Sequence, residues 1–351
     1  MMMALSLAWA IRGQHGHERG AAYVGAMAGL AVAAVTGSER WVWAAVWGSL
    51  GFAIGGAVSY GEFIAHMLRG SLLGLAGVLA TGMFWGALGC GALACGLRRH
   101  RPPEWCAIVV ILAIAWGIMD WPLSTALGHP GLRARVVLVA VLGGLCAGLL
   151  WYYAGIRKDR LLRRLALAGA IGWGVGFPVA SVWLVVGPRT GWALDWWKVM
   201  ELMIGLSGGA WLGLAIIGAP RPPDEALTAW QRWGAVGWLV LGLPSWLWAN
   251  NVHYWVVERG LMTREAGATV WLSWIILLGV YGMLGARGVR SRAWFSQPLP
   301  PESLRWLCLA FVWIGTLTAI AKTSIPVAWG PAQSMLASLA LGLTIALRRP
   351  A

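Results

Sequence analysis

Charged residues are scarce in this 351-residue chain, and acidic residues are the scarcest of them. Asp, Glu, Lys and Arg together make up 11% of the sequence, whereas a soluble domain carries about 25%. Only 13 acidic residues stand against 27 Lys and Arg, which gives a formal net charge of +14. Because 59% of the residues are hydrophobic, the chain is too apolar to cover a soluble surface, and we expect it to fold in a lipid bilayer.

Motifs for several kinds of chemistry are also missing. The sequence has no Walker A motif, no H-E-x-x-H and no G-x-G-x-x-G between a strand and a helix, so nucleotide-driven pumping and zincin chemistry lack support. Its five cysteines include no C-x-x-C pair, and we expect them to be small packing residues. The basic residues lie in short gaps between apolar segments and form no continuous stripe, so no nucleic-acid partner is expected.

Eleven long apolar segments fill most of the chain, and no gap between them could hold a soluble catalytic domain. Most are long enough for a tilted helix to cross roughly 30 Å of hydrocarbon. The predicted fold class is an all-α integral membrane protein, a polytopic bundle of about eleven transmembrane helices. It would form one domain over residues 1–351, with a weak internal duplication of about 1–157 and 158–351 as an alternative. The segments lie at about residues 20–36, 41–59, 70–97, 105–121, 134–155, 161–186, 197–218, 232–249, 268–286, 304–321 and 329–347.

The Lys and Arg residues sort to alternate gaps between these segments. Gaps after the odd-numbered segments, together with the C-terminus, hold 17 of the 27 cations. Short loops rich in Lys and Arg stay in the cytoplasm. The C-terminus is therefore predicted to be cytoplasmic and, with eleven crossings, the N-terminus extracytoplasmic.

Two of the predicted helices contain sequence that disfavours a continuous helix. Residues 2–11 are apolar and precede a polar stretch, so we expect a half-helix that is broken there and continued from residue 20. The stretch 172–178 in the sixth segment holds three glycines and Pro178. Proline removes a backbone donor and kinks or breaks a helix. The first and sixth helices are thus predicted to be broken.

The densest polar cluster runs from Arg12 to Gly20, with five ionisable residues and three glycines between apolar flanks. A charge at a helix centre costs about 2.5–3.5 kcal/mol, so such a cluster needs paired charges or a wet cavity. Transporters use unwound, glycine-containing backbone at their binding sites, although an exposed turn is the plainer alternative. Glu62 and Glu201 each precede a glycine-rich helix and complete the set of candidate substrate-binding residues: Arg12, Gln14, His15, His17, Glu18, Arg19, Glu62 and Glu201.

Asp195, Lys198 and Glu201 are spaced three residues apart at the start of the seventh segment. The lysine can pair with either carboxylate, and mutual neutralisation is the simpler interpretation. Glu201 leads directly into an apolar run. It is therefore the better candidate for an acid that exchanges a proton or binds a solute.

Three functions remain open on this evidence. The first is a secondary transporter or facilitator that moves a small polar solute, with an anion as one option, across the bilayer. The second is an integral-membrane enzyme acting on a lipid-linked or amphiphilic substrate at the extracytoplasmic leaflet, and the third is a non-catalytic subunit of a membrane complex. The enzyme alternative could use a divalent metal with one open coordination position, held by donors from this set: His15, His17, Glu18, Glu62 and His66.

Overall fold

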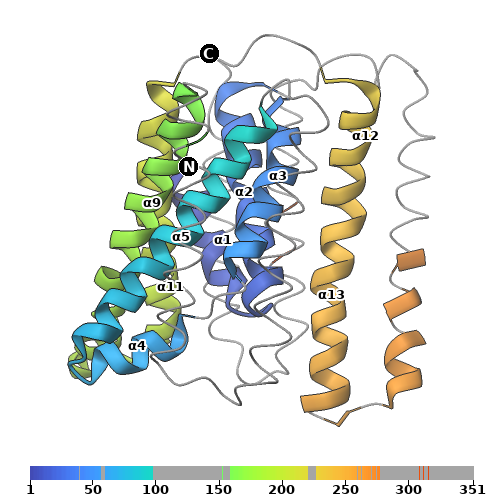
Figure 1. The fold of residues 1–351 in the computed structure, drawn as a ribbon. Helices are drawn as coiled ribbons and strands as arrows, with labels where there is room; N and C mark the ends of the chain where they lie inside the picture. The colour runs from blue at the N-terminus through green and yellow to red at the C-terminus, as the bar shows by residue number, and fades with distance from the viewer. Residues whose placement is uncertain are drawn as a thin grey trace.

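The computed structural model of the chain describes residues 1–38, 40–56, 60–97, 152, 159–219, 227–258, 260–261, 263–269, 271–273, 275–276, 308, 311 and 315. Every element within these ranges is helical (Figure 1). The elements are α1 (Met2–Arg12), α2 (His17–Thr36), α3 (Arg40–Gly56), α4 (Gly61–Leu68), α5 (Leu72–Gly96), α9 (Arg160–Ser181), α10 (Trp183–Val186), η2 (Gly187–Thr190), α11 (Trp196–Ile217), α12 (Ala229–Gly237), η3 (Trp238–Gly242), α13 (Leu243–His253) and η4 (Tyr254–Glu258).

Four helical stretches are long and apolar enough to cross a membrane, which is consistent with a membrane protein. They are His17–Thr36, Leu72–Gly96, Arg160–Thr190 and Trp196–Ile217. The predicted segments 41–59 and 232–249 also coincide with helical elements, α3 and α12 to α13. The segments that lie wholly or mostly outside the described residues are 105–121, 134–155, 304–321 and 329–347, and 268–286 is described only in part.

Polar side chains define where several helices begin. Ser71, Asp159, Asp195 and Thr228 each accept a hydrogen bond from the backbone N–H three residues further on, at the starts of α5, α9, α11 and α12. Such N-caps satisfy donors that a helix leaves free at its first turn. Gly37 ends α2 in the left-handed conformation, with φ 72°, which glycine adopts without strain.

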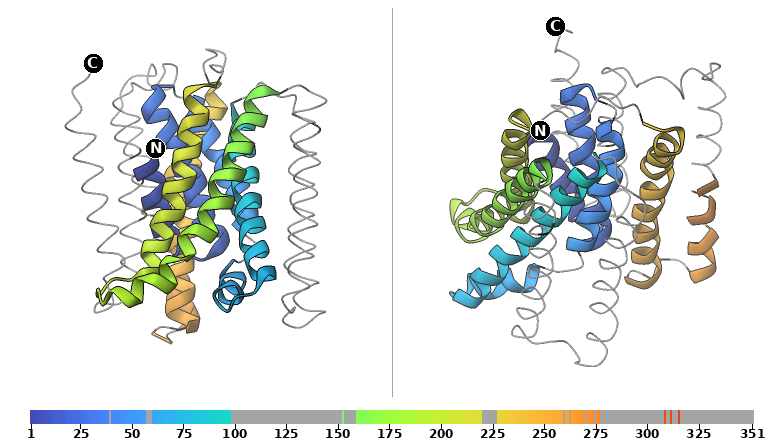
Figure 2. Two further views of the ribbon diagram at one scale, coloured as in Figure 1. Left: turned by 90° about the vertical axis from the view of Figure 1, so that its left-hand side faces the viewer. Right: turned by 45° about the horizontal axis from the view of Figure 1, so that its top comes forward.

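Five long helices pack in series, each antiparallel to the next, in the order α2, α3, α5, α9 and α11. Figure 2 shows α5, α9 and α11 side by side along one face. Gly25 of α2 faces Gly48 of α3, and Gly86 of α5 faces Gly169 of α9, so closely that a Cβ on Gly25 or Gly86 would overlap the opposite carbonyl. Small residues permit this close approach. Helices in lipid depend on such packing, because apolar side chains gain no hydrophobic free energy when they move from lipid into the protein.

The first helix is broken where expected, but the chain reverses instead of continuing. α1 runs antiparallel to α11, with Gly13 beside Glu201 and Leu5 beside Gly205. Through the series of antiparallel contacts, α1 is therefore also antiparallel to α2, and the two helices form a hairpin. The turn includes Gly16 with φ 80°. At a rise of about 1.5 Å per residue, α1 is about 16 Å long, about half the hydrocarbon thickness.

The predicted break in the sixth helix, within residues 172–178, is wrong. α9 continues through this stretch with Pro178 inside it, and the helix is interrupted only at Val182. Gly172 lies against α11 and Gly174 lies against α5. The glycines therefore serve close contacts on two sides of α9, and this packing holds the backbone helical.

Aromatic rings fill the centre of the bundle around α1. The ring of Trp9 lies 5.4 Å from Trp85 of α5, 6.0 Å from Trp173 of α9 and 5.4 Å from Phe177 of α9, between centroids. All four side chains are fully buried. α1 is thus a core element that contacts both α5 and α9 as well as α11.

The elements α12, η3, α13 and η4 follow one another in a single column beside α2 and α3 (Figure 1). Trp238 donates from Nε1 to Ser49 Oγ at 3.0 Å. Arg19 of α2 donates to Asn250 Oδ1 at 2.8 Å. These two polar contacts attach the column to the main bundle.

The close contact between α5 and α9 predicts that Gly86→Ala destabilises the protein. The new methyl group would overlap the carbonyl of Gly169, and overpacking of this kind costs about 1–3 kcal/mol. Gly91→Ala is the matched control on the same helix, because its Cβ would lie 3.6 Å from Ala166 Cβ, an ordinary contact. Thermal unfolding in detergent should show a lower Tm for the first variant only. Equal Tm values would contradict the proposed backbone contact.

Candidate functional site

Arg12 is the last residue of α1 and is buried although it is charged, with 3% of its surface exposed. Its Nη1 donates to the Tyr60 hydroxyl at 2.6 Å, and its Nη2 lies 2.9 Å from His17 Nδ1. Its guanidinium carbon lies 4.8 Å from the centre of the Tyr60 ring and 4.9 Å from that of Trp85. Cation–π contacts stabilise a desolvated cation by about 2 kcal/mol, so the aromatic rings offset part of the cost of burying this guanidinium.

The protonation of both Arg12 partners follows from this geometry. Arginine has donors only, so Nδ1 of His17 accepts the hydrogen bond, and a neutral His17 carries its proton on Nε2. Burial raises the pKa of the Tyr60 hydroxyl above its ordinary value. Tyr60 therefore stays neutral at physiological pH and contributes no negative charge that would balance Arg12.

Glu201 of α11 is fully buried and has a cation on each side. Lys198 Nζ donates to Glu201 Oε2 at 2.5 Å and also to the carbonyl of Ala10 at 2.9 Å. Arg12 Nη1 lies 3.8 Å from Glu201 Oε1. Oε1 has no hydrogen-bond donor among the described residues, so Arg12 reaches this oxygen by charge attraction alone.

Local structure explains why these side chains meet. Asp195 caps α11 and accepts from the backbone N–H of Lys198 at 3.2 Å, and the spacing of three residues places Lys198 and Glu201 on the same helix face. Lys198 also satisfies the Ala10 carbonyl in the last turn of α1, where the helix dipole favours a cation. One ammonium group therefore joins the C-terminal end of α1 to the carboxylate of α11.

The turn between α1 and α2 separates this cluster from the outside. Gly13 lies directly against Glu201, and a Cβ at this position would overlap the carboxylate. Gly13, Gly16 and His17 are all exposed, whereas Arg12 is buried. The first turn of α2 has no side-chain cap, because its N-cap residue is Gly16. The backbone N–H groups at the start of α2 and the side chain of Arg12 are thus close in sequence to exposed residues of the turn.

The charges of the cluster do not cancel among the described side chains. Arg12 and Lys198 carry two positive charges, Glu201 carries one negative charge, and Tyr60 is neutral. All three charged groups are at most 4% exposed. An excess positive charge in a buried site is unfavourable unless an anion or a further carboxylate compensates it. The arrangement can therefore hold an anion.

His15 and Arg19 of the polar stretch form contacts with other parts of the chain. His15 is fully buried, and its Nε2 lies 3.5 Å from the carbonyl of Gly315. Arg19 binds Asn250 on α13, away from Glu201. Gln14 and Glu18 are half-buried at the turn. Of the eight predicted substrate-binding residues, the structure thus brings Arg12, His17 and Glu201 together.

Two predicted residues lie on α4. His66 is half-buried and packs beside Gly74 of α5. Glu62 belongs to the same helix, but its side chain lies outside the described part of the structure, so its predicted proximity to Glu201 stays a prediction. Within the described residues no group of three His, Cys, Asp or Glu side chains could hold a metal ion.

Lys198, Tyr60 and Trp85 belong to the cluster but are absent from the predicted set. Lys198 had a sequence signal, its spacing of three residues from Asp195 and from Glu201. Tyr60 had none, because an aromatic residue at the end of an apolar segment is ordinary in a membrane protein. Trp85 lies inside the segment 70–97, where packing against neighbouring helices is the plainer role of an aromatic residue. Only the packing of α5 and the segment before α4 against α1 brings their rings onto Arg12.

Comparisons with protein-family models, with curated proteins and with solved structures found no match to this chain. Its function is therefore inferred from the residues around Arg12 and Glu201.

The buried pair of Lys198 and Glu201 predicts strong coupling between these positions. Lys198→Met leaves the buried Glu201 carboxylate without its lysine donor, and Glu201→Gln leaves two buried cations without their carboxylate, so each should destabilise the protein by about 3–5 kcal/mol. The double variant should lose clearly less stability than the two single losses together, because neither partner is left charged and alone. Thermal unfolding of the three variants in detergent measures this difference. Strict additivity would show that the two side chains do not interact.

Proposed function

We propose that the protein is a secondary transporter or facilitator for a small anionic solute, which binds at the turn between α1 and α2. The observation that carries this proposal is the buried cluster of Arg12, Lys198 and Glu201, with its excess positive charge, directly beneath an exposed glycine turn. An incoming anion needs to pass only the turn to reach Arg12. His17, which is exposed and bonded to Arg12, would be its first contact.

The uncapped start of α2 supports the choice of an anion. Free backbone N–H groups and the positive end of the helix dipole make a helix N-terminus an anion-binding site. Arg12 lies beside this N-terminus through its contact with His17. Arginine adds a planar pair of donors that matches a carboxylate or a phosphate. Together these groups favour a small oxyanion over a neutral polar solute.

The two arms of the hairpin are attached to different parts of the bundle, which supports a carrier. α1 is bonded to α11 through Lys198 and through Ser6, whose Oγ donates to the Leu202 carbonyl at 2.7 Å. α2 packs along α3 and is bonded to α13 through Arg19. An anion held between Arg12 and the N-terminus of α2 would join the two parts. Its binding and release would change how they pack, as alternating access requires.

The wider topology belongs to the same proposal. Eleven crossings that begin with α2 and end at a cytoplasmic C-terminus would place the α1–α2 turn on the extracytoplasmic side. The extracytoplasmic N-terminus expected from the sequence does not fit the hairpin, because α1 turns back into the bundle and brings Met2 against Gly209, in the middle of α11. Gln14, His15, Glu18, Arg19 and Glu62 are the remaining candidates for the path of the solute.

Anion binding predicts that stabilisation by the solute depends on Arg12 and His17. Purified protein is first screened for a rise in Tm with acetate, lactate, succinate, phosphate and sulfate, and an anion that raises Tm is then tested for uptake into proteoliposomes. Each charged hydrogen bond is worth about 1.5–3 kcal/mol, so His17→Ala and Arg12→Gln should each weaken anion binding roughly tenfold or more.

Arg189→Gln is the matched control, because Arg189 is exposed in η2 and contributes nothing to the cluster. It should bind and transport as the parent does. Parental binding and uptake in both His17→Ala and Arg12→Gln would remove the proposed site. Chemical conversion of a solute, in place of its uptake, would instead favour the enzyme alternative.

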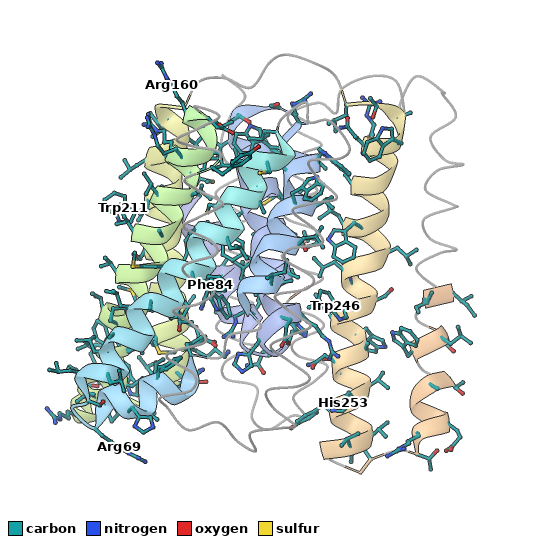
Figure 3. All side chains as sticks on the ribbon, in the orientation of Figure 1. Arg69, Phe84, Arg160, Trp211, Trp246 and His253 are labelled. Atoms are coloured by element: carbon teal, nitrogen blue, oxygen red, sulfur yellow. The ribbon has the colours of Figure 1, made fainter. Side chains whose placement is uncertain are left out.

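The proposed orientation predicts opposite labelling at the two ends of the bundle. Arg160 and Arg69 are both exposed, and Figure 3 shows them at opposite ends. A cysteine at position 160 should resist a membrane-impermeant thiol reagent in intact cells, and a cysteine at position 69 should react, relative to the parent chain. The reverse pattern would invert the topology, and equal reaction at both sites would place both ends on one side of the membrane.

A further inference from the structure

A groove of about 480 Å³ lies between the end of the α13–η4 column and the helical residues 264–269. Its volume falls in the range of about 300–1,000 Å³ that is typical of ligand sites. The groove is separate from the α1–α2 turn and shares no residue with the Arg12 cluster. Its walls are mainly apolar and include Val252, Val256, Val257 and Trp271.

Two basic side chains, His253 and Arg264, also line the groove, and the lining residues that the structure describes include no acid. Both are exposed, and Figure 3 shows His253 near the lower end of α13. Within the described residues neither side chain forms a hydrogen bond or an ion pair. The groove therefore combines apolar walls with two basic groups that are available to a ligand.

We propose that this groove binds one anionic phospholipid, with its phosphate between His253 and Arg264 and the start of an acyl chain along the valines and Trp271. The guanidinium of Arg264 matches a phosphate in charge and geometry. A free inorganic anion would leave the apolar walls exposed to water, whereas an acyl chain would cover them. Trp271 is fixed by the bond from its Nε1 to the Ser245 carbonyl at 3.2 Å, so this wall exists before the lipid binds.

Native mass spectrometry can test this proposal with purified protein and two lipids of identical acyl chains, phosphatidylglycerol and phosphatidylcholine. The parent protein should retain phosphatidylglycerol preferentially. His253→Ala combined with Arg264→Ala should reduce that preference roughly tenfold, as expected when about 1.4 kcal/mol of binding energy is lost. Arg189→Ala, which removes an exposed arginine outside the groove, should leave the preference unchanged.

A second variant tests the occupant independently of charge. Val256→Trp would fill the groove while keeping both basic groups, and it should also lose phosphatidylglycerol. Parental lipid binding in this variant would mean that charge alone attracts the lipid, and an unchanged preference in the double alanine variant would mean that the basic groups do not bind it. Displacement of the lipid by millimolar inorganic phosphate would reassign the site to a soluble anion. Because the two variants act through different atoms, a folding defect in one leaves the other to decide.

Discussion

The ion pair between Lys198 and Glu201 is the interaction on which the centre of this protein depends. It compensates one buried cation, places the carboxylate beside Gly13, and joins α11 to the last turn of α1 through Ala10. Without it the Ala10 carbonyl in the last turn of α1 would lose the lysine that binds it. A second cation, Arg12, then lies near the same carboxylate without a hydrogen bond to it, and the proposed anion site rests on this incomplete neutralisation.

Glycine and aromatic residues complement one another around that pair. Glycines such as Gly25 and Gly86 bring α2, α3, α5 and α9 into backbone contact, where lipid provides no hydrophobic drive for association. The space that remains at the centre is filled by Trp9, Trp85 and Trp173. Tightly packed interiors do not deform continuously. Under the proposed transport function, the helices would therefore move as packed units, and the contacts between these units would change. The glycine turn between α1 and α2 lies between two such units.

An arginine beside apolar side chains occurs at both proposed binding sites. Around Arg12 it is buried, and aromatic rings replace the water that the guanidinium has lost. Around Arg264 it is exposed, and the apolar wall includes Val256 and Trp271. Under the two proposals, a small anion would bind inside the bundle and an anionic lipid would bind at its edge.

The sequence alone determined the helical class and the places of six helical segments, because apolar length and N-cap residues such as Asp195 are local properties. Only the tertiary structure decided that the chain reverses after Arg12, that Pro178 stays inside a helix, and that Lys198 and Tyr60 join the site. These outcomes depend on contacts between segments up to about 190 residues apart. No local sequence pattern predicts which face of α11 packs against α1. Arg12 lies near Glu201 because of this packing.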